Sequence, residues 1–158
     1  MTIEIKLTPG DLSFAQHEGV ARYNYNRAKG HDASGQSGAT WVEQVAHEVS
    51  GCLGELAIAR WLDNFPFSTF ADRKEGDVGP FEVRATAYAT GKLLLQKNDN
   101  PERKYLLVTL PTVYTAYIHG WMWGYEGMVD EYYNTSMRNP CFAIQQQYLK
   151  DPRSLMHG

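Results

Sequence analysis

The stretch Gly76-Asp77-Val78-Gly79-Pro80-Phe81-Glu82-Val83-Arg84 combines a turn with the start of an apolar strand. Side chains alternate along a strand, so Glu82 and Arg84 are expected on one face and Val83 on the other. Carboxylates that lie close together repel each other unless a cation occupies the space between them. Asp77 and Glu82 therefore form a candidate site for a divalent cation, which carboxylate oxygens bind well.

The composition is that of one globular domain covering residues 1–158. Hydrophobic residues make up 43% of the chain and charged residues 21%. The net charge of −3 argues against a basic protein that coats nucleic acid, but not against an enzyme that binds it in one cleft. Cys52 and Cys141 are far apart and predict free thiols. With no apolar run long enough for a membrane span or signal peptide, we expect a cytoplasmic location without membrane contact.

Two helices are predicted from capping boxes, in which residues three positions apart cap the first turn. They are a helix from Thr8 to about Lys29, with Asp11 closing the box, and a helix from Thr40 to about Asp63, with Glu43 closing the box. The later turns of the first helix carry Tyr23, Tyr25 and Arg27. These residues are either polar surface, which is the more common case, or a path for nucleic acid, because aromatic rings stack on bases.

The second predicted helix contains two glycines and a glutamate in an apolar segment. Gly51 and Gly54 each lower helix propensity by about 1 kcal/mol relative to alanine, which suggests close approach of another backbone or a ligand. Glu55 follows them and is expected to have a partner, since a buried carboxylate without one is costly. That partner is either a core arginine or a cation shared with Asp77. Glu48 lies on the same helical stripe as Glu55.

Five stretches have the apolar content or alternation of β-strands. They are residues 3–7, 81–87, 92–97, 105–110 and 114–123. Residues 92–97 are expected to pair antiparallel with 81–87, and 105–110 to form a central strand covered on both faces. A short strand at 65–70 and a flexible loop at 30–39 are also expected.

Together these elements predict an α+β fold. Its centre is a mixed, largely antiparallel β-sheet flanked by the two N-terminal helices. The core is expected over about residues 40–125, and a helical or irregular segment over about 126–158 is expected to pack over the sheet.

The order of these groups resembles the PD-(D/E)xK nuclease superfamily. The resemblance rests on Gly-x-x-Gly-Glu-Leu-Ala-x-x-x-Trp-Leu around Glu55, on Asp77, and on Glu82-x-Arg84. It is nearest to small phage-encoded members, whose next strand reads Leu-Leu-Leu-Gln-Lys and is followed by a Gly-Trp strand. The similarity covers about residues 45–125.

The resemblance implies a metal-dependent nuclease that hydrolyses DNA phosphodiester bonds in phage DNA processing, recombination or degradation, in the host cytoplasm. It implies that Glu55, Asp77 and Glu82, with the backbone carbonyl of Val83, bind Mg²⁺ or Mn²⁺. Such a metal holds a phosphate oxygen and activates water. DNA is the more favoured substrate over RNA, and a homodimer is left open.

The chain departs from the family pattern at Arg84, where the family has lysine. Arginine stays protonated and cannot act as a base, although it can bind phosphate through two N–H groups. Lys97 on the next predicted strand is expected to take the lysine's role, or Gln96 if the register shifts by one residue. Arg84, Lys97 and Glu48 are the candidate substrate-binding residues.

Two alternatives remain open at this stage. One is a catalytically impaired binding protein on the nuclease fold, which engages nucleic acid or a host protein. The other is a structural ion-pair network that joins Glu55, Asp77, Glu82 and Arg84 without any metal.

Overall fold

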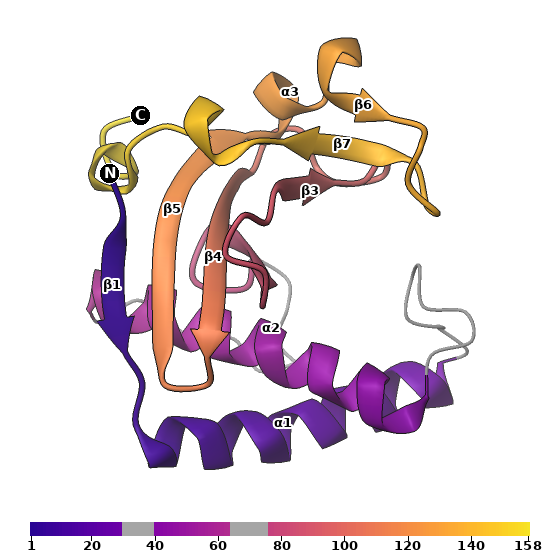
Figure 1. Cartoon of the computed structure of the whole chain (residues 1–158), viewed down its shortest axis with the longest axis vertical. Coiled ribbons are helices and arrows are strands. Elements are labelled where there is room, and N and C mark those ends of the chain that lie inside the picture. Colours follow the sequence, from indigo (N-terminus) through magenta and orange to yellow (C-terminus); the bar gives the residue numbers. More distant parts are fainter. Residues whose placement is uncertain (30–39, 64–75) are drawn as a thin grey trace.

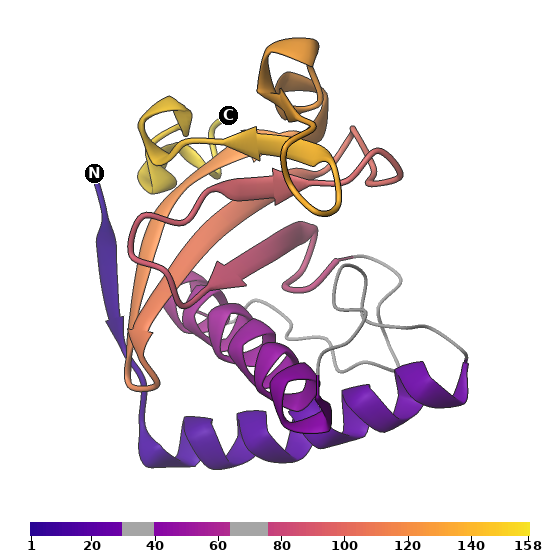
Figure 2. The same ribbon diagram turned by 45° about the vertical axis from the view of Figure 1, so that its right-hand side comes forward.

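The computed structural model describes residues 1–29, 40–63 and 76–158, and these have an α+β fold (Figure 1). Two long helices, α1 (Pro9–Ala28) and α2 (Trp41–Leu62), come early in the chain. In both views α2 lies between α1 and the sheet (Figures 1 and 2). The predicted loop at 30–39 and the predicted strand at 65–70 lie outside the described residues.

Both helices begin at the predicted capping boxes. The Thr8 hydroxyl accepts a hydrogen bond from the Asp11 N–H at 3.1 Å, and the Asp11 carboxylate accepts one from the Thr8 N–H at 2.7 Å. The same reciprocal pair joins Thr40 and Glu43, at 3.3 and 3.1 Å. These bonds satisfy N–H groups that a helix start leaves without intrahelical partners.

The first sheet contains four strands among the described residues, in the order β1-β5-β4-β2. They are β1 (Ile3–Lys6), β2 (Phe81–Thr86), β4 (Lys104–Thr112) and β5 (Thr115–Trp123). The pairs β1–β5 and β4–β5 are antiparallel, and β2–β4 is parallel. The predicted mixed, largely antiparallel sheet is confirmed, as is the interior position of the apolar strand β4.

A second, antiparallel sheet has the strand order β3-β7-β6. It packs on the face of the first sheet that is opposite α2. It contains β3 (Leu93–Leu95), β6 (Tyr133–Asn134) and β7 (Cys141–Ile144). Leu93, Leu95 and Ile144 are fully buried in one cluster with Leu107 and Tyr105 of β4. Short elements complete the chain: helix α3 (Gly124–Gly127) and the 3₁₀ turns η1 (Asp130–Tyr132), η2 (Gln146–Tyr148) and η3 (Pro152–Ser154).

The predicted antiparallel pairing of residues 92–97 with 81–87 is wrong. The strand formed there is β3, which pairs with β7, while β2 pairs in parallel with β4. The physical reason is that both buried side chains of β3, Leu93 and Leu95, are apolar. They pack with apolar side chains of β7 in the second sheet. Strand β7 lies within residues 126–158, for which a helical or irregular segment is expected, so that expectation does not include the partner of β3.

Helix α2 packs closely on strand β2 through Gly54. A Cβ atom at Gly54 would lie 2.7 Å from the Cβ of Ala85, so only glycine allows this approach. Val83 faces the same core, which also contains Leu53, Ile58 and residues of β4 and β5. None of the described helices is long and apolar enough to cross a membrane.

Gly54→Ala is expected to destabilise the fold and Gly51→Ala to stabilise it. Overpacking at Gly54 costs about 1–3 kcal/mol, which exceeds the gain of about 1 kcal/mol in helix propensity. At Gly51 only that gain applies, because no described atom other than its chain neighbours and the helix's own backbone lies within 4 Å of the added Cβ. Urea unfolding of the two variants measures both changes. Equal stability of the two variants would contradict the close contact of α2 with β2.

Candidate functional site

Asp77 is held against the start of β2 by a tight turn. The Asp77 N–H donates to the Phe81 carbonyl at 2.9 Å, and Phe81 and Val78 exchange two further backbone bonds. Gly79 takes a positive φ of 54° within this turn, a backbone conformation that favours glycine. The turn brings the Asp77 carboxylate back onto the strand, where it accepts a bond from the Val83 N–H at 2.8 Å.

The carboxyl of Glu82 lies beside that of Asp77. Burial raises the pKa of Glu82, and the charge of Asp77 and a hydrogen bond with its side chain raise it further. Arg84 and Arg103 lower the pKa of Glu82, but by less. The Nη1 atom of Arg103 is 3.5 Å from the Glu82 carboxylate. The fold therefore holds two carboxyl groups together, and their mutual repulsion is only partly offset.

Arg84 lies on the same face of β2 as Glu82, as predicted. Its guanidinium donates to Asp99 at 3.0 Å and lies 5.0 Å from the centre of the Tyr105 ring. The same Asp99 oxygen accepts the backbone N–H of Gln96 at 2.8 Å. Burial lowers the pKa of Arg84, but the charge and hydrogen bond of Asp99, with the charges of Asp77 and Glu82, together outweigh it, so the net shift is upward. Arg84 is thus a fixed, permanently charged group.

Gln96 and Lys97 are not placed on a strand next to β2. Strand β3 ends at Leu95, and both residues lie in the turn that follows it. The ammonium of Lys97 lies 4.7 Å from the centre of the Tyr133 ring in the second sheet. Gln96 contributes its backbone N–H to Asp99. The structure therefore does not bring the Lys97 side chain to the Asp77–Glu82 pair.

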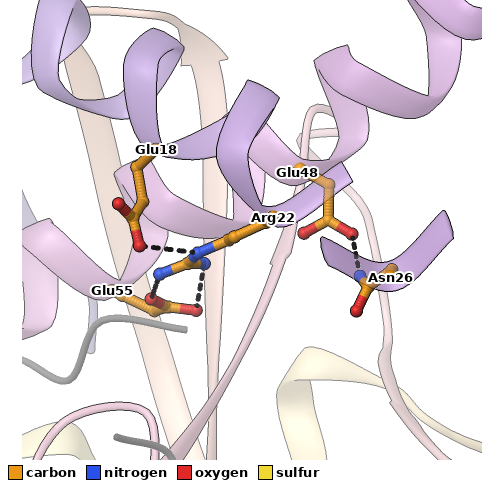
Figure 3. Close-up of polar contacts among 5 residues, drawn as sticks. All are labelled: Glu18, Arg22, Asn26, Glu48 and Glu55. Atoms are coloured by element: carbon orange, nitrogen blue, oxygen red, sulfur yellow. Dashed lines mark hydrogen bonds and ion pairs between the residues drawn. The ribbon is translucent and has the colours of Figure 1, made fainter. Parts of the chain in front are cut away.

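Glu55 forms a two-pronged ion pair with Arg22 of α1 (Figure 3). Its two carboxylate oxygens accept N–H groups of Arg22 at 3.0 and 2.7 Å, and Glu18 lies 3.5 Å from Arg22 Nε. All three side chains are buried. Burial lowers the pKa of Arg22, but the hydrogen bond and charge of Glu55, with the charges of Cys52 and Glu18, together outweigh it, so the net shift is upward. Of the two partners predicted for Glu55, the structure places it on a core arginine.

Glu48 also joins the two helices. Its carboxylate accepts a hydrogen bond from the Asn26 side chain at 3.1 Å (Figure 3). Its predicted role in substrate binding remains a prediction. Among the residues the structure describes, Glu48 connects α2 to α1 in the same helix–helix interface as Glu55.

The predicted set Glu55, Asp77 and Glu82 is not assembled. Within the ranges 1–29, 40–63 and 76–158, no three His, Cys, Asp or Glu side chains come together in a way that could hold a metal. Val83 and Ala85 face α2, so alternation places Glu82 on the opposite face from Glu55. What remains is the pair Asp77–Glu82. Two carboxylates fit Mg²⁺ or Mn²⁺, since such ions often keep water or phosphate as their other ligands.

The sequence reading missed Asp99, Arg103 and Tyr105. Asp99 lies in the polar loop before β4, and Tyr105 pairs with Glu82 in the parallel register. Tyr105 and Arg103 could be placed near Glu82 only from the pairing register of β2 with β4, which the sequence does not specify.

No protein-family model, no curated protein and no solved structure matches this chain.

Arg22→Met is expected to lower the free energy of unfolding by about 3–5 kcal/mol, because it removes the guanidinium that two buried carboxylates share. The matched control is Arg153→Met, which breaks an ion pair with Asp151 whose side chains are 54% and 41% exposed. That change should cost less than about 1 kcal/mol. Urea unfolding compares them. Similar losses in both variants would show that the Arg22–Glu55 pair does not hold α1 to α2.

Glu82→Gln is expected to gain stability relative to the wild type as pH rises. The raised pKa means that the folded protein holds the Glu82 proton more tightly than the unfolded chain does. This group therefore favours folding below its ordinary pKa of 4.5, and that contribution is lost as pH rises through the raised value. Glutamine has no such loss. Thermal unfolding without divalent cations, from acidic to neutral pH, measures the difference, with Glu102→Gln as control. A difference that does not change with pH would contradict the raised pKa.

Proposed function

We propose that this protein is a Mg²⁺- or Mn²⁺-dependent nuclease that hydrolyses DNA phosphodiester bonds. The observation that supports this most is the Asp77–Glu82 pair, two adjacent carboxyl groups that raise the cost of ionising Glu82. A divalent cation removes that cost and turns the pair into ligands. A group whose pKa is shifted by burial together with a specific neighbouring charge is typical of functional sites.

Asp77 and Glu82 would hold the cation, with the backbone carbonyl of Val83 as a further ligand. When bound, such a cation lowers the pKa of a water molecule and stabilises charge on the phosphate. Asp77 is oriented for this role by the Val83 N–H, which fixes one of its oxygens. Glu82 would exchange its contact with Arg103 for the metal.

Arg84 and Arg103 would bind the phosphate. The Arg84 guanidinium donates one hydrogen bond to Asp99, at 3.0 Å, and makes a cation–π contact with the Tyr105 ring. The other N–H groups of an arginine can then donate to phosphate oxygens where charge develops. Arg84 keeps its proton, so it orients and stabilises the phosphate and does not remove a proton from water.

The PD-(D/E)xK core is part of this proposal. It is supported by the order of a helix, a turn with Asp77, and a strand with Glu82 and Arg84. Two features of this chain differ from the expectation, namely the position of β3 and the pairing of Glu55 with Arg22. Among the carboxylates, the proposed metal ligands are therefore Asp77 and Glu82, without Glu55.

A second candidate is a binding protein that has lost hydrolysis. The observation that favours it is that Arg84 and Arg103 already contact acids, Asp99 and Glu82. In that case the protein would bind nucleic acid or a host protein without needing a metal.

Asp77→Asn and Glu82→Gln are expected to reduce Mg²⁺- or Mn²⁺-dependent DNA cleavage by about 100-fold or more, since loss of second-shell groups alone costs 10–100-fold. The assay is digestion of plasmid and single-stranded DNA by the folded proteins, with Glu102→Gln as the matched control. Calorimetric titration with Mn²⁺ should show binding to the wild type that each variant loses. Full cleavage by either variant would overturn the assigned site. A wild type that neither cleaves nor binds Mn²⁺, but binds DNA, would support the second candidate.

A further inference from the structure

The end of α1 and the start of α2 lie at the lower right of Figure 1. Aromatic rings and cations from these two helix ends contact each other. We call this group the aromatic–cation patch. It consists of Tyr23, Tyr25, Arg27 and Lys29 from the end of α1, and Trp41 from the start of α2. None of these residues takes part in the site around Asp77.

The rings of the patch are held in place by each other and by the cations. Tyr23 meets Trp41 edge to face, with ring centres 6.3 Å apart at 88°. The guanidinium carbon of Arg27 lies 5.7 Å from the centre of the Tyr23 ring, and the ammonium of Lys29 lies 4.6 Å from that of Tyr25. Each contact is within the range of aromatic or cation–π attraction.

The patch is open to solvent. Trp41 is 55% exposed and Tyr25 is 37% exposed. The nearest acids on α2 have other partners: Glu43 caps the Thr40 N–H, and Glu48 accepts from Asn26. A tryptophan in this position contributes little to the core, so its ring is available for contact with another molecule.

Single-stranded nucleic acid fits this chemistry best. Its bases present flat faces that stack on exposed aromatic rings, and its phosphates pair with cations placed between those rings. A duplex hides the base faces and would use only the cations. An apolar protein surface would bury Arg27 and Lys29 without partners, at a cost in desolvation.

We propose that the aromatic–cation patch binds single-stranded nucleic acid, with a base on Trp41 and phosphates on Arg27 and Lys29. This inference rests on the proposed function, since it names the form of nucleic acid that reaches the nuclease. The binding itself needs no metal.

The test is fluorescence anisotropy with labelled oligothymidine, oligouridine and a DNA duplex, in the presence of EDTA. The wild type should bind the single strands more tightly than the duplex. Trp41→Ala and the double variant Arg27→Ala/Lys29→Ala should each weaken single-strand binding about tenfold, as loss of a stacking residue commonly does. The double variant should also reduce the salt dependence of binding. The controls are Tyr88→Ala, which removes a ring that is 77% exposed, and Arg153→Ala.

The outcomes separate this inference from the proposed function. Unchanged binding in the patch variants, an equal loss in the controls, preference for duplex, or no binding by the wild type would overturn the patch. Loss of binding in Asp77→Asn and Glu82→Gln, with the patch variants unaffected, would assign nucleic acid to the acidic site instead. Binding that depends on the patch in a protein that never cleaves would overturn only the nuclease.

Discussion

The close contact between Gly54 of α2 and Ala85 of β2 determines which face of β2 carries the charged side chains of Glu82 and Arg84. A side chain at position 54 would meet Ala85 at 2.7 Å, so the helix rests directly on the strand. With Val83 and Ala85 turned to α2, alternation turns Glu82 and Arg84 to the face that the second sheet covers. Glu55 is next to Gly54 in the chain, yet it lies on the other side of β2 from Glu82 and turns to α1.

The acid pairs Glu55–Glu18 and Asp77–Glu82 differ in how their charge is balanced. Glu55 and Glu18 share Arg22, so the helix interface gives both carboxylates a cationic partner. Asp77 and Glu82 lie together, and Glu82 keeps a raised pKa although Arg84 and Arg103 are near. An arrangement that costs stability and is not needed to join two elements is where function is most reasonably sought. The proposed metal site therefore contains two carboxylates, Asp77 and Glu82, and no longer includes Glu55.

Local sequence patterns predicted the local structure well. The contacts between residues far apart in the chain could not be predicted from them. The capping boxes at Thr8 and Thr40 located both helix starts, since the residues that form them are three positions apart. Alternation correctly placed Glu82 and Arg84 on one face. The partner of β3 could not be read in the same way, because β7 lies almost 50 residues further along the chain. For the same reason Arg22 could not be chosen over a metal as the partner of Glu55.

Whether Asp77 and Glu82 bind a divalent cation is the central question, and a crystal structure of the protein soaked in Mn²⁺ tests it most directly through anomalous scattering. One Mn²⁺ is expected between the two carboxylates, with Arg103 moved away from Glu82 and Glu55 still on Arg22. Metal binding by the Asp77–Glu82 pair would be contradicted if no ion appears there while Glu82 keeps its contact with Arg103, or if the ion is bound by Glu55.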